Sequence, residues 1–80
     1  MNWTKVQEPN DKVPYNHTEL VTPIGTYLID WKGWKTSPSY DISLKGEWLD
    51  SQYDLDTAKN TAENHLLELC NQLNGFIKSQ

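Results

Sequence analysis

Apolar and polar residues alternate in two stretches of the chain, residues 26–34 and residues 40–45. Successive side chains of a β-strand point to opposite faces, so this alternation predicts two strands that are each buried on one face. The residues that share the buried face are Tyr27, Ile29, Trp31, Tyr40, Ile42 and Leu44. Lys45-Gly46 predicts a tight turn, and residues 47–49 a short third strand. These stretches indicate an antiparallel meander.

The C-terminal part of the chain has the period of an amphipathic helix, predicted from near Leu55 to near Asn74. Its apolar stripe holds Leu55, Ala62, Leu66, Leu69, Leu73 and Ile77, with Ala58, Cys70 and Phe76 beside it. Asp54 suits the N-cap, and Asn74-Gly75 is a stop signal after which the chain is expected to fold back. On the flank of the stripe, Cys70 is expected to be a small buried hydrophobe.

A sheet and a helix that each have one apolar face are expected to cover each other. The sequence therefore predicts an α+β domain over residues 19–80, in which a three-stranded antiparallel sheet packs against one C-terminal helix in the order β-β-β-α. Residues 19–22 are expected to be extended, and Pro23-Ile24-Gly25 to form a tight turn. Residues 1–18 contain two prolines and follow neither period, so they predict an extended N-terminal arm.

The charge of the chain narrows the range of partners. Its 80 residues include seven Lys, no Arg and eleven acidic residues, which gives a net charge of −4. Nucleic-acid binding relies on Lys and Arg to displace counterions, so direct contact with nucleic acid is not expected. An acidic chain suits a basic partner, such as a protein that itself holds nucleic acid. The alternative is that the charge only keeps a small protein soluble.

No apolar run is long enough to span a membrane, and the first residues lack the apolar stretch of a secretion signal. The single cysteine cannot form an internal disulfide. A cytoplasmic protein of one domain, without membrane contact, is therefore expected.

The sequence contains no pattern typical of catalysis or cofactor binding. His17 and His65 have no second His or Cys at ligand spacing, so no metal is expected. The four glycines are isolated, which excludes a phosphate-binding loop. Neither a paired nucleophile and base nor a pocket for an acid–base pair is indicated, so we expect no enzyme activity and no cofactor.

Five carboxylates lie within residues 41–56, which contain only one cation, Lys45. Trp48 lies among these carboxylates, and Trp34 precedes them. Clustered acids and exposed Trp side chains are typical of binding surfaces. The predicted partner-binding residues are Trp34, Asp41, Glu47, Trp48, Asp50, Asp54 and Asp56. Two alternatives remain: the acids form a solvated edge that assists the helix cap, and the tryptophans close the small core.

Residues 27–34, Tyr-Leu-Ile-Asp-Trp-Lys-Gly-Trp, resemble the central strand of chromodomains, which reads Tyr-Leu-Val-Lys-Trp-Lys-Gly-Trp or close variants. The resemblance implies an aromatic cage for methylated lysine that includes Trp31 and Trp34. The family continues with Asn-Thr-Trp-Glu-Pro, where this chain has Ser-Pro-Ser-Tyr-Asp, and the alternation assigns Trp31 to the core.

A longer pattern joins Thr22-Pro23-Ile24-Gly25-Thr26-Tyr27 to a helix start at Asp54-Leu55-Asp56-Thr57-Ala58-Lys59 that is followed by His65. It is similar to small bacteriophage and prophage accessory proteins and covers about half of the chain. The resemblance implies an inhibitor of a host defence complex, of the kind that anti-CRISPR proteins represent, acting in the host bacterial cytoplasm.

These observations lead to one functional expectation and two alternatives. We expect a phage-encoded, non-enzymatic protein that blocks a host protein or ribonucleoprotein with a basic surface. The alternatives are a chromodomain-like reader with an aromatic cage, and a homodimeric structural or regulatory phage protein.

Overall fold

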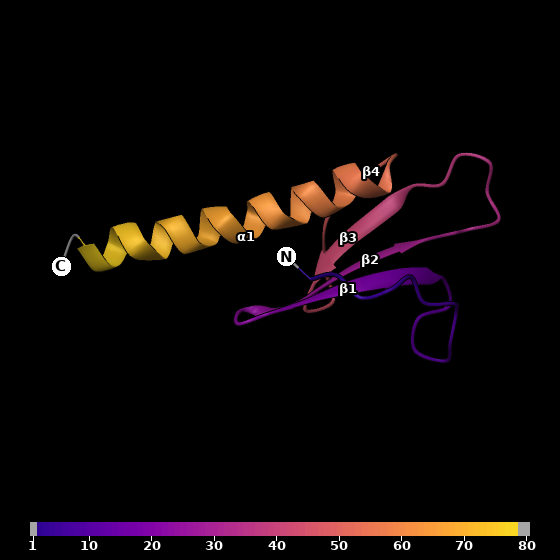
Figure 1. Ribbon diagram of the computed structural model, residues 1–80, viewed down its shortest axis with the longest axis horizontal. Coiled ribbons are helices and arrows are strands. Elements are labelled where there is room, and N and C mark those ends of the chain that lie inside the picture. The colour runs from indigo at the N-terminus through magenta and orange to yellow at the C-terminus, as the bar shows by residue number, and fades with distance from the viewer. Residues whose placement is uncertain (1, 79–80) are drawn as a thin grey trace.

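The computed structural model describes the backbone of residues 2–78 and the side chains of residues 2–72. A four-stranded antiparallel sheet in the order β1-β2-β3-β4 packs against one C-terminal helix, α1 (Figure 1). The elements are β1 (Asn16–Thr22), β2 (Gly25–Trp31), β3 (Tyr40–Leu44), β4 (Glu47–Gln52) and α1 (Leu55–Lys78). The α+β class and the helix on an antiparallel sheet are thus confirmed, whereas three strands is wrong.

The additional strand is β1, which begins within the segment expected to be an extended arm. It pairs with β2 from Asn16 opposite Trp31 to Thr22 opposite Gly25. The sequence of β1 lacks apolar alternation, because one of the positions that face the helix holds a polar residue. Thr18, which is fully buried, and Leu20 both face the helix. The hydroxyl of Thr18 donates to the carbonyl of Thr4 at 2.7 Å, so a polar residue fills a core position without an unsatisfied group.

The core lies between α1 and one face of the sheet. Its buried members are Leu20, Tyr27, Ile29, Trp31, Ile42, Ala58 and Ala62. The predicted inward positions of β2 are confirmed, and Tyr40 and Leu44 pack around them partly buried. Ala58 and Ala62 have no exposed surface, and their small side chains let the helix backbone approach the aromatic residues of the sheet.

Both hairpin turns use backbone that favours glycine. Gly25 ends the β1–β2 turn with φ of 134°, and a side chain there would meet the aliphatic stem of Lys45 at 2.8 Å. Lys45 and Gly46 both have positive φ, as a two-residue hairpin turn requires. The two predicted turns are therefore confirmed.

The helix starts where the sequence predicts and ends later. A carboxylate oxygen of Asp54 accepts hydrogen bonds from the backbone N–H of Thr57 at 3.0 Å and from its hydroxyl at 3.2 Å, which makes Asp54 the N-cap. The expected stop at Asn74-Gly75 is wrong, because α1 continues to Lys78. The side chains of Leu73, Phe76 and Ile77, expected on or near the apolar stripe, lie outside the described residues.

The helix is longer than the sheet it covers, so the molecule measures 50 × 24 × 21 Å (Figure 1). Among the described side chains, Leu66 is the last one of α1 that packs against the core. We call residues 67–78 the overhang. Across residues 2–78, no helix is both long enough and apolar enough to cross a membrane.

The residues before β1 are bonded to both layers. The N–H of Thr4 donates to the carbonyl of Glu19, and Gln7 and His17 exchange two backbone hydrogen bonds at 2.8 and 3.0 Å. The indole N–H of Trp3 donates to Oε1 of Glu63 on α1 at 3.0 Å. The arm therefore covers the outer edge of β1 and reaches the helix.

Candidate partner-binding surface

The helix covers one face of the sheet and leaves the other face open (Figure 1). In β2, the core residues alternate with Leu28 and Asp30, which therefore point to the open face. Asp41 and Ser43 of β3 lie directly opposite them, so they share this face. These side chains therefore do not contribute to the core between the sheet and α1.

A row of polar side chains crosses the open face. Asp30 lies opposite Asp41, and Asp41 lies opposite Ser51. The hydroxyl of Ser51 donates to Oδ1 of Asp41 at 2.6 Å and accepts the indole N–H of Trp48 at 3.1 Å. Ser51 thereby holds the ring of Trp48 near a carboxylate, although 64% of the Trp48 side chain remains exposed.

The register of β4 depends on a bulge. Asp50 pairs with Ile42 while Trp48 pairs with Ser43, so Leu49 is an extra residue between the two pairs. The bulge allows Trp48 and Ser51 to share the open face, while Leu49 packs against the core. Trp48 and Ser51 are three positions apart, so in a regular strand without a bulge they would point to opposite faces.

The electrostatics of this row are unfavourable for the isolated protein. Burial raises the pKa of Asp30 above its ordinary value, the charge of Asp41 raises it further, and His17 lowers it in part. His17 is itself buried, and its Nδ1–H donates to the carbonyl of Tyr15 at 2.9 Å. Like charges directly opposite each other destabilise a sheet, so a cation from a partner would relieve a repulsion already present.

A pocket of about 260 Å³ lies beside the two carboxylates. Its lining consists of Tyr15, Asp30, Trp31, Lys32, Lys35, Ser39 and Asp41. The ammonium of Lys32 lies 5.4 Å from the centre of the Tyr15 ring, at cation–π distance. The Tyr15 ring is also 6.2 Å from that of Trp34, so aromatic rings flank the pocket.

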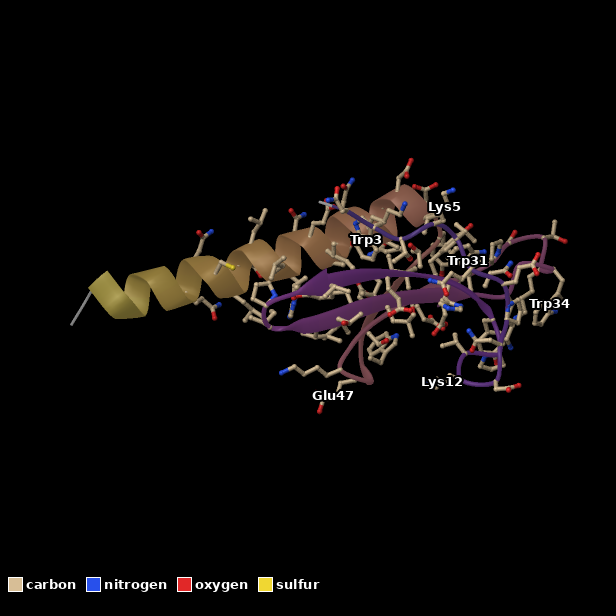
Figure 2. All side chains as sticks on the ribbon, turned by 60° about the horizontal axis from the view of Figure 1, so that its bottom comes forward. Trp3, Lys5, Lys12, Trp31, Trp34 and Glu47 are labelled. Carbon is tan, nitrogen blue, oxygen red and sulfur yellow. The ribbon has the colours of Figure 1, made fainter. Side chains whose placement is uncertain are left out.

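Trp34 lies in the loop between β2 and β3, at the end of the molecule farthest from the overhang (Figure 2). Of its side chain, 69% is exposed. We call the set Tyr15, Asp30, Trp34, Asp41, Trp48 and Ser51 the acidic aromatic surface.

Of the seven predicted site residues, three belong to this surface: Trp34, Asp41 and Trp48. The other four lie outside it. Glu47 is exposed at the β3–β4 turn. Asp56 is exposed in the first turn of α1.

Asp50 and Asp54 already have partners within the chain. Asp50 lines a groove between β4 and α1 rather than the open face, and its carboxylate accepts hydrogen bonds from the N–H of Ser51 and the side chain of Gln52. Asp54 caps the helix. The five acids therefore do not form one continuous patch.

Three residues of the surface, Tyr15, Asp30 and Ser51, are not among those that the sequence predicts. Tyr15 is in the segment expected to be an arm, and Ser51 follows the end of the predicted third strand. Asp30 alternates with the buried residues of its strand, but no property of the sequence indicates that it lies opposite Asp41. The pairing register supplies that information, and it depends on both hairpin turns.

The two tryptophans of the chromodomain-like segment have different neighbours. Trp31 is 8% exposed and packs on Tyr40, with ring centres 5.0 Å apart. Trp34 is exposed and packs on Tyr15 instead. Trp31 lines the pocket beside Asp30 and Asp41 together with Tyr15, and Trp34 contacts that pocket through the ring of Tyr15.

The remaining reactive side chains lie elsewhere. The hydroxyl of Tyr27 is hydrogen-bonded to Nδ1 of His65 at 2.7 Å, and burial, followed by the nearby charge of Cys70, raises the pKa of Tyr27. The expected burial of Cys70 is wrong: the thiol is exposed, because α1 has left the sheet at that point. Among the described residues, no three His, Cys, Asp or Glu side chains are placed to hold a metal ion.

Comparison of the chain with protein-family models, curated proteins and solved structures gives no match. The functional conclusion therefore depends on the geometry and chemistry of the surface.

Proposed function

We propose that the protein is a non-enzymatic binding protein that holds a basic partner on its acidic aromatic surface. The observation that carries the proposal is the chain of hydrogen bonds from Trp48 through Ser51 to Asp41. It holds an exposed aromatic ring near a carboxylate that lies opposite a second carboxylate, Asp30.

Three physical arguments support this function. Exposed Trp side chains contribute strongly to protein–protein affinity when a partner covers them. A ring already held by a hydrogen bond loses less conformational entropy on binding than a free one. A partner cation near Asp30 and Asp41 would offset the repulsion between them, which adds to the effect of burial in raising the pKa of Asp30.

The partner class in this proposal follows from charge and from the phage resemblance. The chain carries a net charge of −4, so a basic surface attracts it at long range. A host defence complex that binds nucleic acid presents such a surface. We include in the proposal that the protein is phage-encoded and inhibits such a complex in the host cytoplasm by covering this surface, without touching nucleic acid itself.

Affinity purification from a bacterial lysate tests the proposal. The bait proteins are the wild type, Trp48→Ala, Asp41→Asn and a control, Asp56→Asn, which removes the same charge from the exposed first turn of α1. We expect the wild type and the control to capture the same basic protein, and salt to elute it. Each of the two surface variants should weaken its binding at least about tenfold.

Two results would contradict this function. One is that the wild type captures no basic protein. The other is that all four baits capture it equally, since the contact would then lie outside the acidic aromatic surface.

A further inference from the structure

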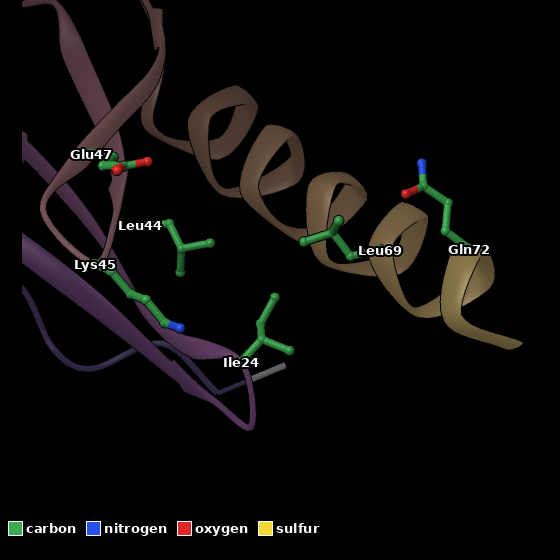
Figure 3. Close-up of a pocket in the computed structure, with 6 residues that line it drawn as sticks. All are labelled: Ile24, Leu44, Lys45, Glu47, Leu69 and Gln72. Carbon is green, nitrogen blue, oxygen red and sulfur yellow. The ribbon is translucent and has the colours of Figure 1, made fainter. Parts of the chain in front are cut away.

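The helix and the two hairpin turns enclose a groove at the start of the overhang. The groove has a volume of about 470 Å³ and an apolar lining. Its lining residues are Ile24, Leu44, Lys45, Glu47, Leu69 and Gln72 (Figure 3). Ile24 comes from the β1–β2 turn, Leu44 from the end of β3, and Leu69 from the first part of the overhang, so the helix diverges from the sheet here.

The overhang has few charges for an exposed helix. It carries two charged residues of opposite sign, Glu68 and Lys78, and residues 69–77 between them carry none. Leu67 is 50% exposed, and Cys70 is also exposed. Depletion of charge combined with exposed apolar side chains is typical of the centre of a protein–protein interface.

The helical state of the overhang also calls for a partner. The overhang continues a helix that already packs on the sheet, but it extends without packing beneath it, and glycine in a helix interior costs about 1 kcal/mol relative to alanine. The overhang nevertheless remains helical through Asn74-Gly75 to Lys78, with no sheet beneath it (Figure 1). Contacts with another molecule would supply the missing packing.

We propose that a second copy of this chain supplies these contacts, the overhang of each copy lying in the groove of the other across a two-fold axis. An occupant of the groove must be elongated, apolar and almost uncharged, and the overhang has these properties. Because the overhang adjoins the groove, a single two-fold axis can place the overhang of each copy in the groove of the other.

Charge favours this contact over other contacts between two copies. Two chains with a net charge of −4 repel each other, and this repulsion is weakest where acidic residues are fewest. The overhang carries Glu68 and Lys78, and the groove carries Lys45 and Glu47, so each side of the contact has no net charge. The inference does not rest on the proposed function, because the groove and the acidic aromatic surface have no residue in common, and Trp34 lies at the opposite end of the molecule from the overhang (Figure 2).

Sedimentation equilibrium of the full chain between about 1 and 200 µM tests the dimer, because this range detects dissociation constants in the micromolar region. We expect a monomer–dimer equilibrium in the wild type. Leu69→Glu should raise the dissociation constant at least about tenfold. The matched control, Val6→Glu, adds the same charge at an exposed apolar position of the arm and should leave the constant unchanged. Circular dichroism checks that both variants fold.

A second measurement locates the interface without any substitution. A spin label on the exposed Cys70 gives one probe per chain, so any distance between two labels must come from a dimer. Overhangs packed side by side predict a distance of about 10–25 Å, set by the spacing of packed helices and the length of the label.

The outcomes separate this proposal from the proposed function. A wild type that remains monomeric overturns the dimer, and so does a dimer whose Cys70 labels are farther apart than predicted. Leu69→Glu should still capture the basic partner, whereas Trp48→Ala should still form dimers. Each proposal can therefore fail while the other stands.

Discussion

At the scale of single residues, Asp30 and Asp41 place two negative charges opposite each other in the sheet. Replacing either aspartate with asparagine would remove this repulsion. Selection for stability alone would therefore not keep both acids. Retaining an unfavourable pair beside two exposed tryptophans is typical of a site where stability is traded for binding.

We therefore predict that Asp30→Asn stabilises the fold at pH 7 by about 0.2–1 kcal/mol, the range for a cross-strand pair. The raised pKa means that the folded state binds the proton more tightly, so stability falls as the pH rises from the ordinary pKa of Asp through the raised one. The gain should therefore disappear near about pH 3, where the acid is protonated in both states. Urea unfolding at both pH values measures it.

The control for this prediction is Asp11→Asn, which removes an exposed carboxylate from the loop before β1. It should change the free energy of unfolding by less than about 0.5 kcal/mol at either pH. A loss of stability in Asp30→Asn at pH 7 would show that the carboxylate is held by favourable contacts rather than opposed by Asp41.

At the scale of elements, the two ends of α1 differ in how well they follow from local sequence. The beginning depends on one side chain, Asp54, that bonds a backbone group three residues later. Such a cap involves only neighbours in the chain, so the sequence predicts it. The end depends on whether packing sustains the helix past Asn74-Gly75, and no local signal carries that information.

We expect Asp54→Ala to lower the free energy of unfolding by about 1 kcal/mol, because the backbone N–H and the hydroxyl of Thr57 then lose their acceptor and the helix start loses a negative charge. Asp56→Ala is the matched control: it removes an acid from the same turn, and its cost should be only a few tenths of a kcal/mol, through the helix dipole. Thermal unfolding of both variants compares them. Equal losses would mean that the dipole, and not the cap, dominates.

The strand β1 was missed for a physical reason. Sequence patterns detect strands through apolar alternation, but β1 presents Thr18 to the core and buries His17 on the other side. Both polar groups are satisfied by the residues before the strand, through the carbonyls of Thr4 and Tyr15. The contact between Thr18 and Thr4 joins residues 14 positions apart, so it forms only once the chain is folded.

At the scale of the whole molecule, the N-terminal residues join the two layers. Trp3 packs against the core and donates to Glu63 of α1, while Thr4 and Gln7 bond to β1. The strand and helix periods of the sequence predict the layered architecture. They do not predict that the N-terminal residues connect the two layers. This connection is made between residues sixty positions apart.

Trp3→Ala should therefore destabilise the protein by about 1–3 kcal/mol, since a half-buried indole is lost. The amide protons of Thr4 and Gln7 should also exchange faster, because the arm is then released from the helix. In the control, Glu63→Gln, an oxygen remains to accept the indole N–H, so stability should change by less than about 0.5 kcal/mol. Unchanged exchange in Trp3→Ala would show that β1 alone holds the arm.

The acidic aromatic surface could be predicted only in part. The sequence identifies Trp34, Trp48 and Asp41 as candidates but leaves open whether the two tryptophans are exposed or close the core; both are exposed. Their grouping could not be predicted, because the bulge at Leu49 decides which β4 side chains share a face with Asp41. Asp50 follows Trp48 by two positions, as same-face residues of a regular strand do, yet it lies on the helix side.

The placement of Trp34 and the overhang at opposite ends of the long axis has a consequence for potency. Joined by their overhangs, two copies would point their binding ends away from each other, as a bivalent ligand does. Against a target with repeated sites, the first attachment would hold the second end at high effective concentration, and avidity would then exceed the strength of either attachment alone.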